Sequence, residues 1–274
     1  MAGTAVSGDI RGRVKQQLAR VAGGVPGEGA TVLIYHRVGG GSADELDVTT
    51  ADFTAQMDLL AELPPSRVVG LDEATDRLEA GRRTPSTVLT FDDGFADVYE
   101  NAWPLLRERG LPFTVYLASG QVGGEMRWEG STAKESGAPG LSWDQLREMA
   151  GSGLCTVANH TRSHARPDLL STAELDACND DVEQHLGTRP KHFAYTWGVP
   201  VPHMDEALRA RFRTSATGRV GRNDPGFDPV RFCRVPVRRT DPIDFYRAKL
   251  YGRLLPERAY ARIVATAKAV GARA

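Results

Sequence analysis

The stretch Ser86-Thr-Val-Leu-Thr-Phe-Asp-Asp-Gly94 combines a strand-like apolar run with two adjacent carboxylates. Its β-branched and apolar positions suit a strand of a parallel sheet, which is covered on both faces. Asp92 and Asp93 follow where such a strand leaves the core, and two neighbouring carboxylates repel each other and lose hydration there. A bound cation would make one carboxylate a ligand and keep the other ionised. The alternative is an ordinary turn, since Asp-Gly is a frequent turn dipeptide.

Strand-like and helix-like segments alternate around this stretch along nearly the whole chain. The segments with strand character are 31–38, 67–71, 86–93, 111–118, 155–160, 191–198, 214–217 and 232–237. The segments with helical character are 52–63, 72–80, 97–109, 142–149, 171–186, 204–212 and 241–270. This order predicts βα units that close into a barrel or form a doubly wound sheet. We expect an N-terminal helix and linker over residues 1–28, followed by one domain over residues 29–274.

Composition narrows the classes of partner and compartment. The chain has 34 basic and 35 acidic residues, so there is no electrostatic case for a nucleic-acid partner. Cys155, Cys178 and Cys233 form no CxxC pair, which fits a reducing compartment. Residues 9–22 are charged throughout and predict a short amphipathic helix, not a secretory signal. We therefore expect a cytoplasmic protein without a transmembrane segment, with at most weak membrane-surface contact through this helix.

A second motif, His160-Thr-Arg-Ser-His164, places two imidazoles four residues apart. If the segment turns helically after its strand, both rings face the same way and can share one ion. Together with Asp93 they offer two nitrogens and one carboxylate, the ligand set of an open hydrolytic metal site. The alternative is a pair of solvated surface histidines.

Both motifs resemble a known family. Thr90-Phe-Asp-Asp-Gly94 and His160-Thr-Arg-Ser-His164 are similar to the first two motifs of the polysaccharide deacetylases, also called NodB-homology or carbohydrate esterase family 4 proteins. Leu33-Ile-Tyr-His-Arg-Val38 resembles the opening strand of the branch that deacetylates poly-N-acetylglucosamine, and Leu141-Ser-Trp143 also fits. The resemblance covers roughly residues 30–240 and implies a distorted (β/α)7 barrel.

The resemblance also implies roles for individual residues. Asp93, His160 and His164 would bind a divalent metal, and Asp92 would be the catalytic base. Zinc suits two nitrogens and one oxygen, with cobalt, nickel and manganese as alternatives. The implied reaction is hydrolysis of an N-acetyl group on an amino sugar of a glycan or glycoconjugate, giving acetate and a free amine.

The sequence departs from the family pattern in its third motif. Phe193-Ala-Tyr-Thr-Trp-Gly198 has Ala194 where an arginine would position the base. Arg234, in the strand-like segment 232–237, is our candidate replacement and would pair with Asp92. The alternative for Arg234 is a purely structural ion pair.

The general acid and the sugar contacts are also open in the sequence. His203 is the last histidine, so none stands where many members carry a late one. His36, at the end of the first strand, is our candidate for the acid or a substrate contact, or else a hydrogen-bonded strand-end histidine. Tyr195, Trp197 and Trp128 could stack on a sugar ring or could be core aromatics.

These inferences predict a metal-dependent carbohydrate N-deacetylase. Two alternatives remain at this stage. One is an enzyme of the same fold that acts on O-acetyl esters or on cyclic imides or ureides. The other is a sugar-binding barrel without catalysis.

Overall fold

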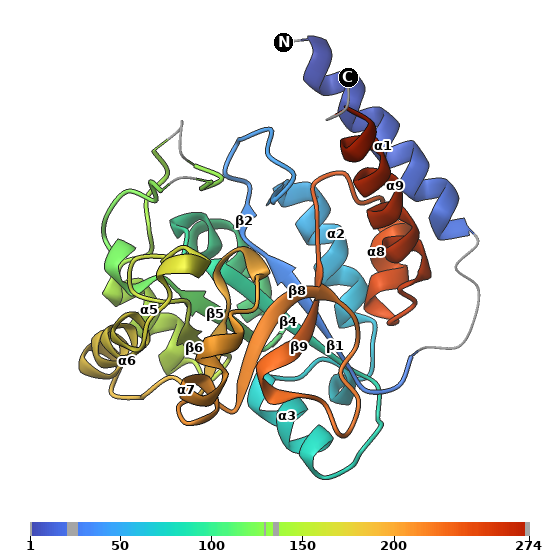
Figure 1. The fold of residues 1–274 in the computed structure, drawn as a ribbon. Helices are drawn as coiled ribbons and strands as arrows, with labels where there is room; N and C mark the ends of the chain where they lie inside the picture. Colours follow the sequence, from blue (N-terminus) through green and yellow to red (C-terminus); the bar gives the residue numbers. More distant parts are fainter. Residues whose placement is uncertain (1, 21–26, 129, 134–136, 272–274) are drawn as a thin grey trace.

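The computed structural model describes residues 2–20, 27–128, 130–133 and 137–271, and its centre is a closed barrel of parallel strands (Figure 1). In the described part of the chain the barrel has seven strands, in the order β1-β4-β5-β6-β7-β8-β9. Their bounds are β1 Ala30–Tyr35, β4 Ser86–Asp93, β5 Phe113–Leu117, β6 Cys155–Asn159, β7 His192–Ala194, β8 Thr214–Val220 and β9 Phe232–Pro236. The predicted (β/α)7 barrel is therefore confirmed.

Strand register closes the barrel and also distorts it. β1 pairs with β4 from Ala30↔Ser86 onward and with β9 through Leu33↔Val235, so the first strand joins both sides. β7 is short and pairs with β6 only through Asn159↔Phe193. The pairing of β8 with β9 shifts register between Ala216 and Val220.

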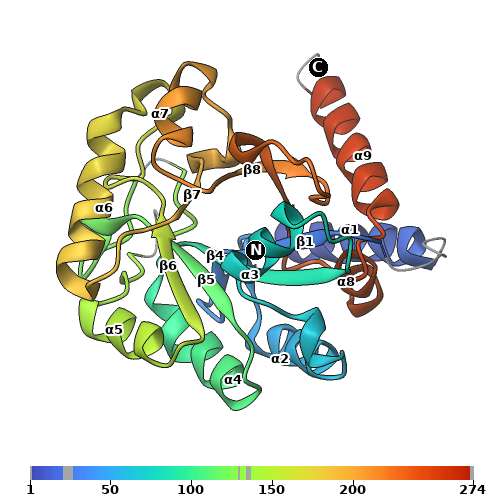
Figure 2. The ribbon, with the colours of Figure 1, turned by 90° about the horizontal axis from the view of Figure 1, so that it is seen from below.

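Helices surround the strands, as the view along the barrel shows (Figure 2). Their bounds are α1 Ala2–Arg20, α2 Thr50–Ala61, α3 Leu71–Glu79, α4 Trp103–Glu108, α5 Trp143–Gly151, α6 Thr172–Leu186, α7 Asp205–Arg209, α8 Ile243–Leu250 and α9 Leu255–Gly271. A π-helical turn, Val98–Ala102, precedes α4. Two short strands, β2 (Arg37–Val38) and β3 (Asp47–Val48), form a small sheet after β1.

Side chains alternate between the inside of the barrel and the layer below the helices. The inward positions include the small residues Ala158, Ala194 and Ala216, which pack with Tyr116. The outward positions are larger: Phe91 lies 5.3 Å from Tyr35, measured between ring centroids. Small inward residues leave room in the barrel for the polar groups at its carboxyl end.

Residues 67–71 differ from the prediction of a strand. Pro65–Arg67 forms a 3₁₀ turn, Val68 makes a single bridge to Thr87, and α3 begins at Leu71. A short apolar run is ambiguous between a strand and a helix start, and here the helix begins within it.

The N-terminal helix is attached by a buried charge. Ile10, an apolar residue of the predicted helix over 9–22, is 57% exposed, whereas Lys15 is fully buried. The Lys15 ammonium donates to Asp241 Oδ1 at 2.8 Å, and Asp241 also accepts from Lys249 at 2.5 Å. Burial lowers the pKa of Lys15, and Asp241 counteracts that effect. Residues 21 and 22 of the prediction lie outside the described residues.

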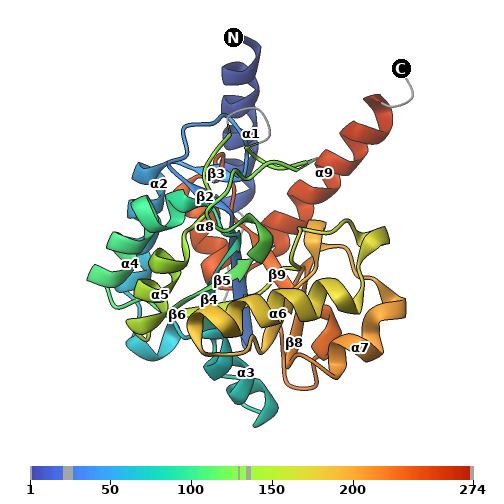
Figure 3. The ribbon, with the colours of Figure 1, turned by 90° about the vertical axis from the view of Figure 1, so that its left-hand side faces the viewer.

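Through this contact α1 packs on the C-terminal helices. Figures 1 and 3 show α1 and α9 extending from the barrel on the side where β2 lies, which is the carboxyl end of β1. No helix among the described residues is long and apolar enough to cross a membrane. The domain boundary at residue 28 and the membrane-surface contact stay predictions.

We expect Lys15→Ala to lower the free energy of unfolding by about 3 kcal/mol, because it removes one partner of a buried ion pair. Urea denaturation followed by circular dichroism measures this change. Arg20→Ala is the matched control, since Arg20 is exposed and donates to Gln17 Oε1, within its own helix, at 3.5 Å. Equal stability of the two variants would contradict the role assigned to Lys15.

Candidate active site

The candidate site lies where the carboxyl ends of the barrel strands meet. Asp92 and Asp93 end β4, His36 directly follows β1, and His160 directly follows β6. Arg234 reaches the same region from β9. Parallel strands in a barrel bring their carboxyl ends to one rim, so residues far apart in sequence converge there.

Both adjacent aspartates line one cavity because the backbone changes direction between them. Successive side chains of a strand normally point to opposite faces. Asp93 has a φ of 76°, in the left-handed region that is uncommon for residues other than glycine. The strand alternation therefore ends at Asp92, and both carboxylates line a cavity of about 280 Å³.

Asp93, His160 and His164 come together at this cavity. Asp93 Oδ1 lies 3.4 Å from His160 Nε2 and 3.3 Å from His164 Nε2. One ligand atom from each residue lies within 4.8 Å of the others, and all three residues are buried. The loop after β6 does not meet the condition of a helical turn: Thr161 and His164 adopt φ of 65° and 56°, and this irregular loop brings His164 to the site.

Hydrogen bonds define which atoms face the centre of the site. The Nδ1 atom of His160 lies 2.9 Å from the Ala194 carbonyl oxygen. A carbonyl only accepts, so Nδ1 carries the proton and Nε2 presents a lone pair toward Asp93. Asp93 Oδ1 is buried and has no hydrogen-bond partner among the described residues. An unsatisfied buried carboxylate oxygen beside two imidazole nitrogens fits a cation site.

The electrostatics of the site keep both carboxylates ionised. Burial acts to raise the pKa of Asp93, but the contacts with His160 and His164 outweigh it and hold that pKa well below its usual value. Burial likewise acts to raise the pKa of Asp92, and Arg234 is the main group that lowers it. For His160, burial acts to lower the pKa, but the neighbouring carboxylates, Asp93 foremost, outweigh it and the pKa is raised. For His164, burial dominates and the pKa is lowered. Asp92 is paired with Arg234, so the negative charge of Asp93 is the one that attracts a cation to the cavity.

Arg234 makes the predicted pair with Asp92. Its Nη1 and Nη2 atoms donate to Asp92 Oδ1 at 2.6 Å and to Oδ2 at 2.9 Å, and the arginine is 1% exposed. Its Nε donates to the Thr217 carbonyl at 3.2 Å. This bidentate geometry fixes the plane of the Asp92 carboxylate.

Tyr116 is a residue that the sequence analysis missed. The Arg234 guanidinium carbon lies 5.1 Å from the centroid of its ring, which supports the ion pair from below. Strand register pairs Tyr116 with Asp92, and the inward positions of β5 were the available signal for it.

His36 lies in the same cavity as the two aspartates. Its Nδ1 atom is buried and has no hydrogen-bond partner in the described part of the chain. The alternative, in which His36 is a hydrogen-bonded strand-end histidine, therefore has no support at this atom. Its role as acid or substrate contact stays a prediction.

The three aromatic residues predicted as candidate sugar contacts divide into two groups. Trp197 lines the cavity and is 44% exposed, and Trp128 lines it from the loop after β5. Tyr195 is 1% exposed, lies among core residues and donates from its hydroxyl to the Val230 carbonyl at 3.2 Å. The prediction that Tyr195 contacts a sugar is therefore wrong, because its ring is buried behind the site.

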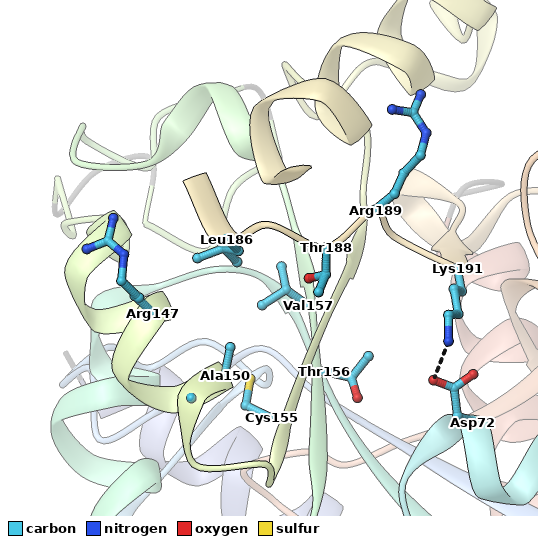
Figure 4. Close-up of a pocket in the computed structure, with 11 residues that line it drawn as sticks. Asp72, Arg147, Ala150, Cys155, Thr156, Val157, Leu186, Thr188, Arg189 and Lys191 are labelled. Carbon is cyan, nitrogen blue, oxygen red and sulfur yellow. Dashed lines mark ion pairs between the residues drawn. The ribbon is translucent and has the colours of Figure 1, made fainter. Parts of the chain in front are cut away.

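A second cavity, of about 380 Å³, lies at the opposite end of the barrel, between α5, α6 and the start of β6 (Figure 4). Its walls include Cys155, Val157 and Leu186. Figure 4 shows the guanidinium groups of Arg147 and Arg189 pointing away from it. It lacks the converging polar groups of the first cavity among the residues that the structure describes, so the chemistry is expected at the first.

Comparisons with known proteins agree with this geometry. The family profile described as polysaccharide deacetylase matches residues 80–211. The Bacillus subtilis (strain 168) protein YxkH, which is named for the same family, is 25% identical over 134 residues, or 48% of this chain and 42% of that protein. The chain thus matches less than half the length of this curated relative.

Solved structures extend the match over most of the chain. IcaB from Ammonifex degensii is 31% identical with a TM-score of 0.69, covering 83% of this chain and 98% of that one. The Streptococcus pyogenes deacetylase PplD, solved in complex with acetate, has the same fold at 20% identity and a TM-score of 0.63, covering 81% of this chain and 98% of that one. The chain belongs to the polysaccharide deacetylase family.

Proposed function

We propose that this protein is a metal-dependent hydrolase that removes N-acetyl groups from an amino sugar in a glycan or glycoconjugate. The observation that carries the proposal is the convergence of Asp93, His160 and His164 beside an ionised Asp92. Membership of the polysaccharide deacetylase family supports deacetylation as the reaction.

The three converging residues suit a divalent metal. They offer two imidazole nitrogens and a carboxylate oxygen that has no other partner in the described structure, which suits zinc and also cobalt, nickel or manganese. When bound, such an ion polarises a carbonyl group and makes water more acidic. Three protein ligands leave coordination positions open for water and substrate.

Asp92 is placed to act as the base. Its carboxylate lies in the cavity beside Asp93, and the bidentate contact with Arg234 prevents it from rotating. Each of its oxygens keeps a free lone pair, because a carboxylate accepts about four hydrogen bonds. Asp92 would take a proton from the water that attacks the acetyl carbon.

His36 is the candidate for the acid. When the C–N bond breaks, the amine nitrogen must gain a proton, and the His36 imidazole lies in the same cavity from the side of β1. The products would be acetate and a free amine. The exposed part of Trp197 at the mouth offers a flat apolar surface for a sugar ring.

The ion pair between Arg234 and Asp92 argues against the alternative of an inactive sugar-binding barrel. That alternative arose because the third motif lacks its arginine, and Arg234 now supplies a guanidinium to Asp92 from β9. The other alternative, action on O-acetyl esters, is distinguished from N-deacetylation in the test below by comparing N-acetylated with O-acetylated substrates.

We expect the purified protein to contain close to one equivalent of divalent metal and to release acetate from N-acetylglucosamine oligomers. Dipicolinate should abolish both properties, and added Zn²⁺ or Co²⁺ should restore them. Metal content is measured by mass spectrometry, and acetate by a coupled enzymatic assay. Metal bound without acetate release from any N-acetylated glycan, but with release from O-acetylated sugars, would contradict the N-acetyl assignment.

We expect Arg234→Ala to lower kcat at least about 100-fold while metal content is retained, because Asp92 loses the group that orients and ionises it. Arg234→Lys keeps the charge without the bidentate geometry, so its kcat should lie between those of the unmodified protein and Arg234→Ala. Arg247→Ala is the control, since Arg247 lies on α8 and pairs with Asp244 at 2.7 Å. Unchanged turnover in Arg234→Ala would show that the ion pair is only structural.

We expect His36→Gln to slow hydrolysis of an N-acetyl sugar by about 100-fold, because an amine leaving group requires a proton. The same variant should hydrolyse 4-nitrophenyl acetate almost as fast as the unmodified protein, since nitrophenolate leaves without protonation. Steady-state kinetics with the two substrates give this ratio. An equal loss on both substrates would exclude His36 as the acid.

A further inference from the structure

The two histidines of the proposed metal site are oriented by different means. Histidines that bind metals usually donate their second ring nitrogen to an oxygen acceptor, which fixes the ring. His160 follows this rule through the Ala194 carbonyl at 2.9 Å. The Nδ1 atom of His164 is buried and has no hydrogen-bond partner among the described residues. Something other than a second hydrogen bond must therefore fix the ring of His164.

Two tryptophans contact the His164 ring. The Trp128 ring stacks on it with centroids 4.5 Å apart and planes at 27°. The Trp197 ring lies at the same centroid distance, tilted by 56°. We call Trp128 and Trp197 the Trp pair. These contacts restrict rotation of an imidazole that is itself only 7% exposed.

The backbone around His164 is fixed by the segment that carries Trp197. The Thr196 hydroxyl donates to the Ala165 carbonyl at 2.6 Å, and the Ala165 amide donates to the Thr161 hydroxyl at 2.8 Å. The first bond joins the two loops and the second lies within the loop after β6, and neither determines the rotation of the His164 ring. Trp197 adopts a φ of 55°, a conformation that costs free energy in a residue with a side chain. A strained tryptophan beside a metal ligand indicates that its position matters.

Trp128 is presented by a loop with a small core of its own. Phe95, Met126, Ala133 and Ala138 form a buried cluster against which Trp128 packs. The Met126 amide donates to the Ala138 carbonyl at 2.9 Å, which pairs residues 124–128 with residues 137–140. We call these two paired segments the Trp128 loop. The position of the Trp128 ring therefore depends on how this loop is folded.

We propose that the Trp pair positions His164 for the metal, replacing the second hydrogen bond that this histidine lacks, and that metal binding and the folded state of the Trp128 loop are coupled. The inference rests on the proposed metal site. A ligated imidazole carries added positive charge, and the face of an indole ring is electron-rich, so the stacking strengthens when the metal binds. By linkage, a bound metal stabilises the loop as much as the folded loop favours the metal.

The test compares Zn²⁺ affinity, measured by competition with a chromophoric chelator, in three variants of the full chain. We expect Trp128→Leu to bind Zn²⁺ about 10–100-fold more weakly, as observed when groups that orient metal ligands are removed. Trp128→Phe keeps an aromatic ring and should recover part of the loss. Trp143→Leu is the matched control. The Trp143 ring stacks on His185, with centroids 4.2 Å apart, and does not line the cavity, so this variant should bind Zn²⁺ normally.

Limited proteolysis of the unmodified protein tests the coupling without any substitution. Arg127 precedes Trp128 in the loop and is exposed, so trypsin reaches it when the loop opens. We expect Zn²⁺ to slow cleavage after Arg127 and to leave cleavage after Arg82, in an exposed turn after α3, unchanged. Mass spectrometry of the fragments follows both sites.

The outcomes separate this inference from the proposed function. Two results would overturn the positioning role of the Trp pair and leave the deacetylase proposal intact. One is an unchanged Zn²⁺ affinity in Trp128→Leu, and the other is a rate of cleavage after Arg127 that does not change when Zn²⁺ is added. A raised KM for glycan with normal Zn²⁺ affinity would show that Trp128 is only a wall of the substrate site. An unmodified protein that binds no Zn²⁺, Co²⁺, Ni²⁺ or Mn²⁺ would overturn both.

Discussion

The structure of the candidate site depends on the separation of two like charges that are adjacent in the chain. Asp92 and Asp93 would repel each other in a buried environment if both faced the same partner. The left-handed backbone at Asp93 lets both carboxylates enter one cavity but in different directions. Asp92 meets the guanidinium of Arg234, and Asp93 meets two imidazoles. The charge of Asp92 is thereby compensated by Arg234, and the charge of Asp93 is left for the proposed metal that it would share with the two imidazoles.

Closure of the barrel determines which residues can supply these neighbours. In the strand order, β9 and β6 each stand two positions from β4, with β1 and β5 between them. Arg234 therefore reaches Asp92 across β1, and His160 reaches Asp93 across β5, through an interior where Ala194 and Ala216 occupy little space. An arginine on β7 would approach from the far side of His160. Since β1 joins β4 to β9, weakening that pairing would separate the base from its arginine as well as open the fold.

The sequence predicted the parts of this arrangement that follow from local periodicity. Strands that end in Asp92-Asp93 and His160 imply convergence, because parallel strands share a carboxyl rim. Periodicity does not reveal tertiary partners, so the burial of Tyr195 and the burial of Lys15 against Asp241 were not predictable. Nor does it reveal irregular backbone: His164 reaches the site through left-handed residues, not through a helical turn. Trp128 and Trp197, which stack on His164, lie about 35 residues before and after it in the sequence, a relation that no local pattern encodes.

In the proposed enzyme, Trp197 would connect substrate recognition with the metal ligands. Part of its ring contacts His164, and 44% of the residue remains exposed at the mouth of the cavity. A sugar ring that stacks on the exposed part would press on a side chain whose other part restrains a metal ligand. The hydrogen bond from Thr196 to Ala165 transmits any shift of this turn directly to the His164 backbone. In the proposed enzyme, substrate binding and the geometry of the metal ligands would then not be independent, and a poorly fitting sugar would be rejected through misplacement of His164 as much as through lost contact area.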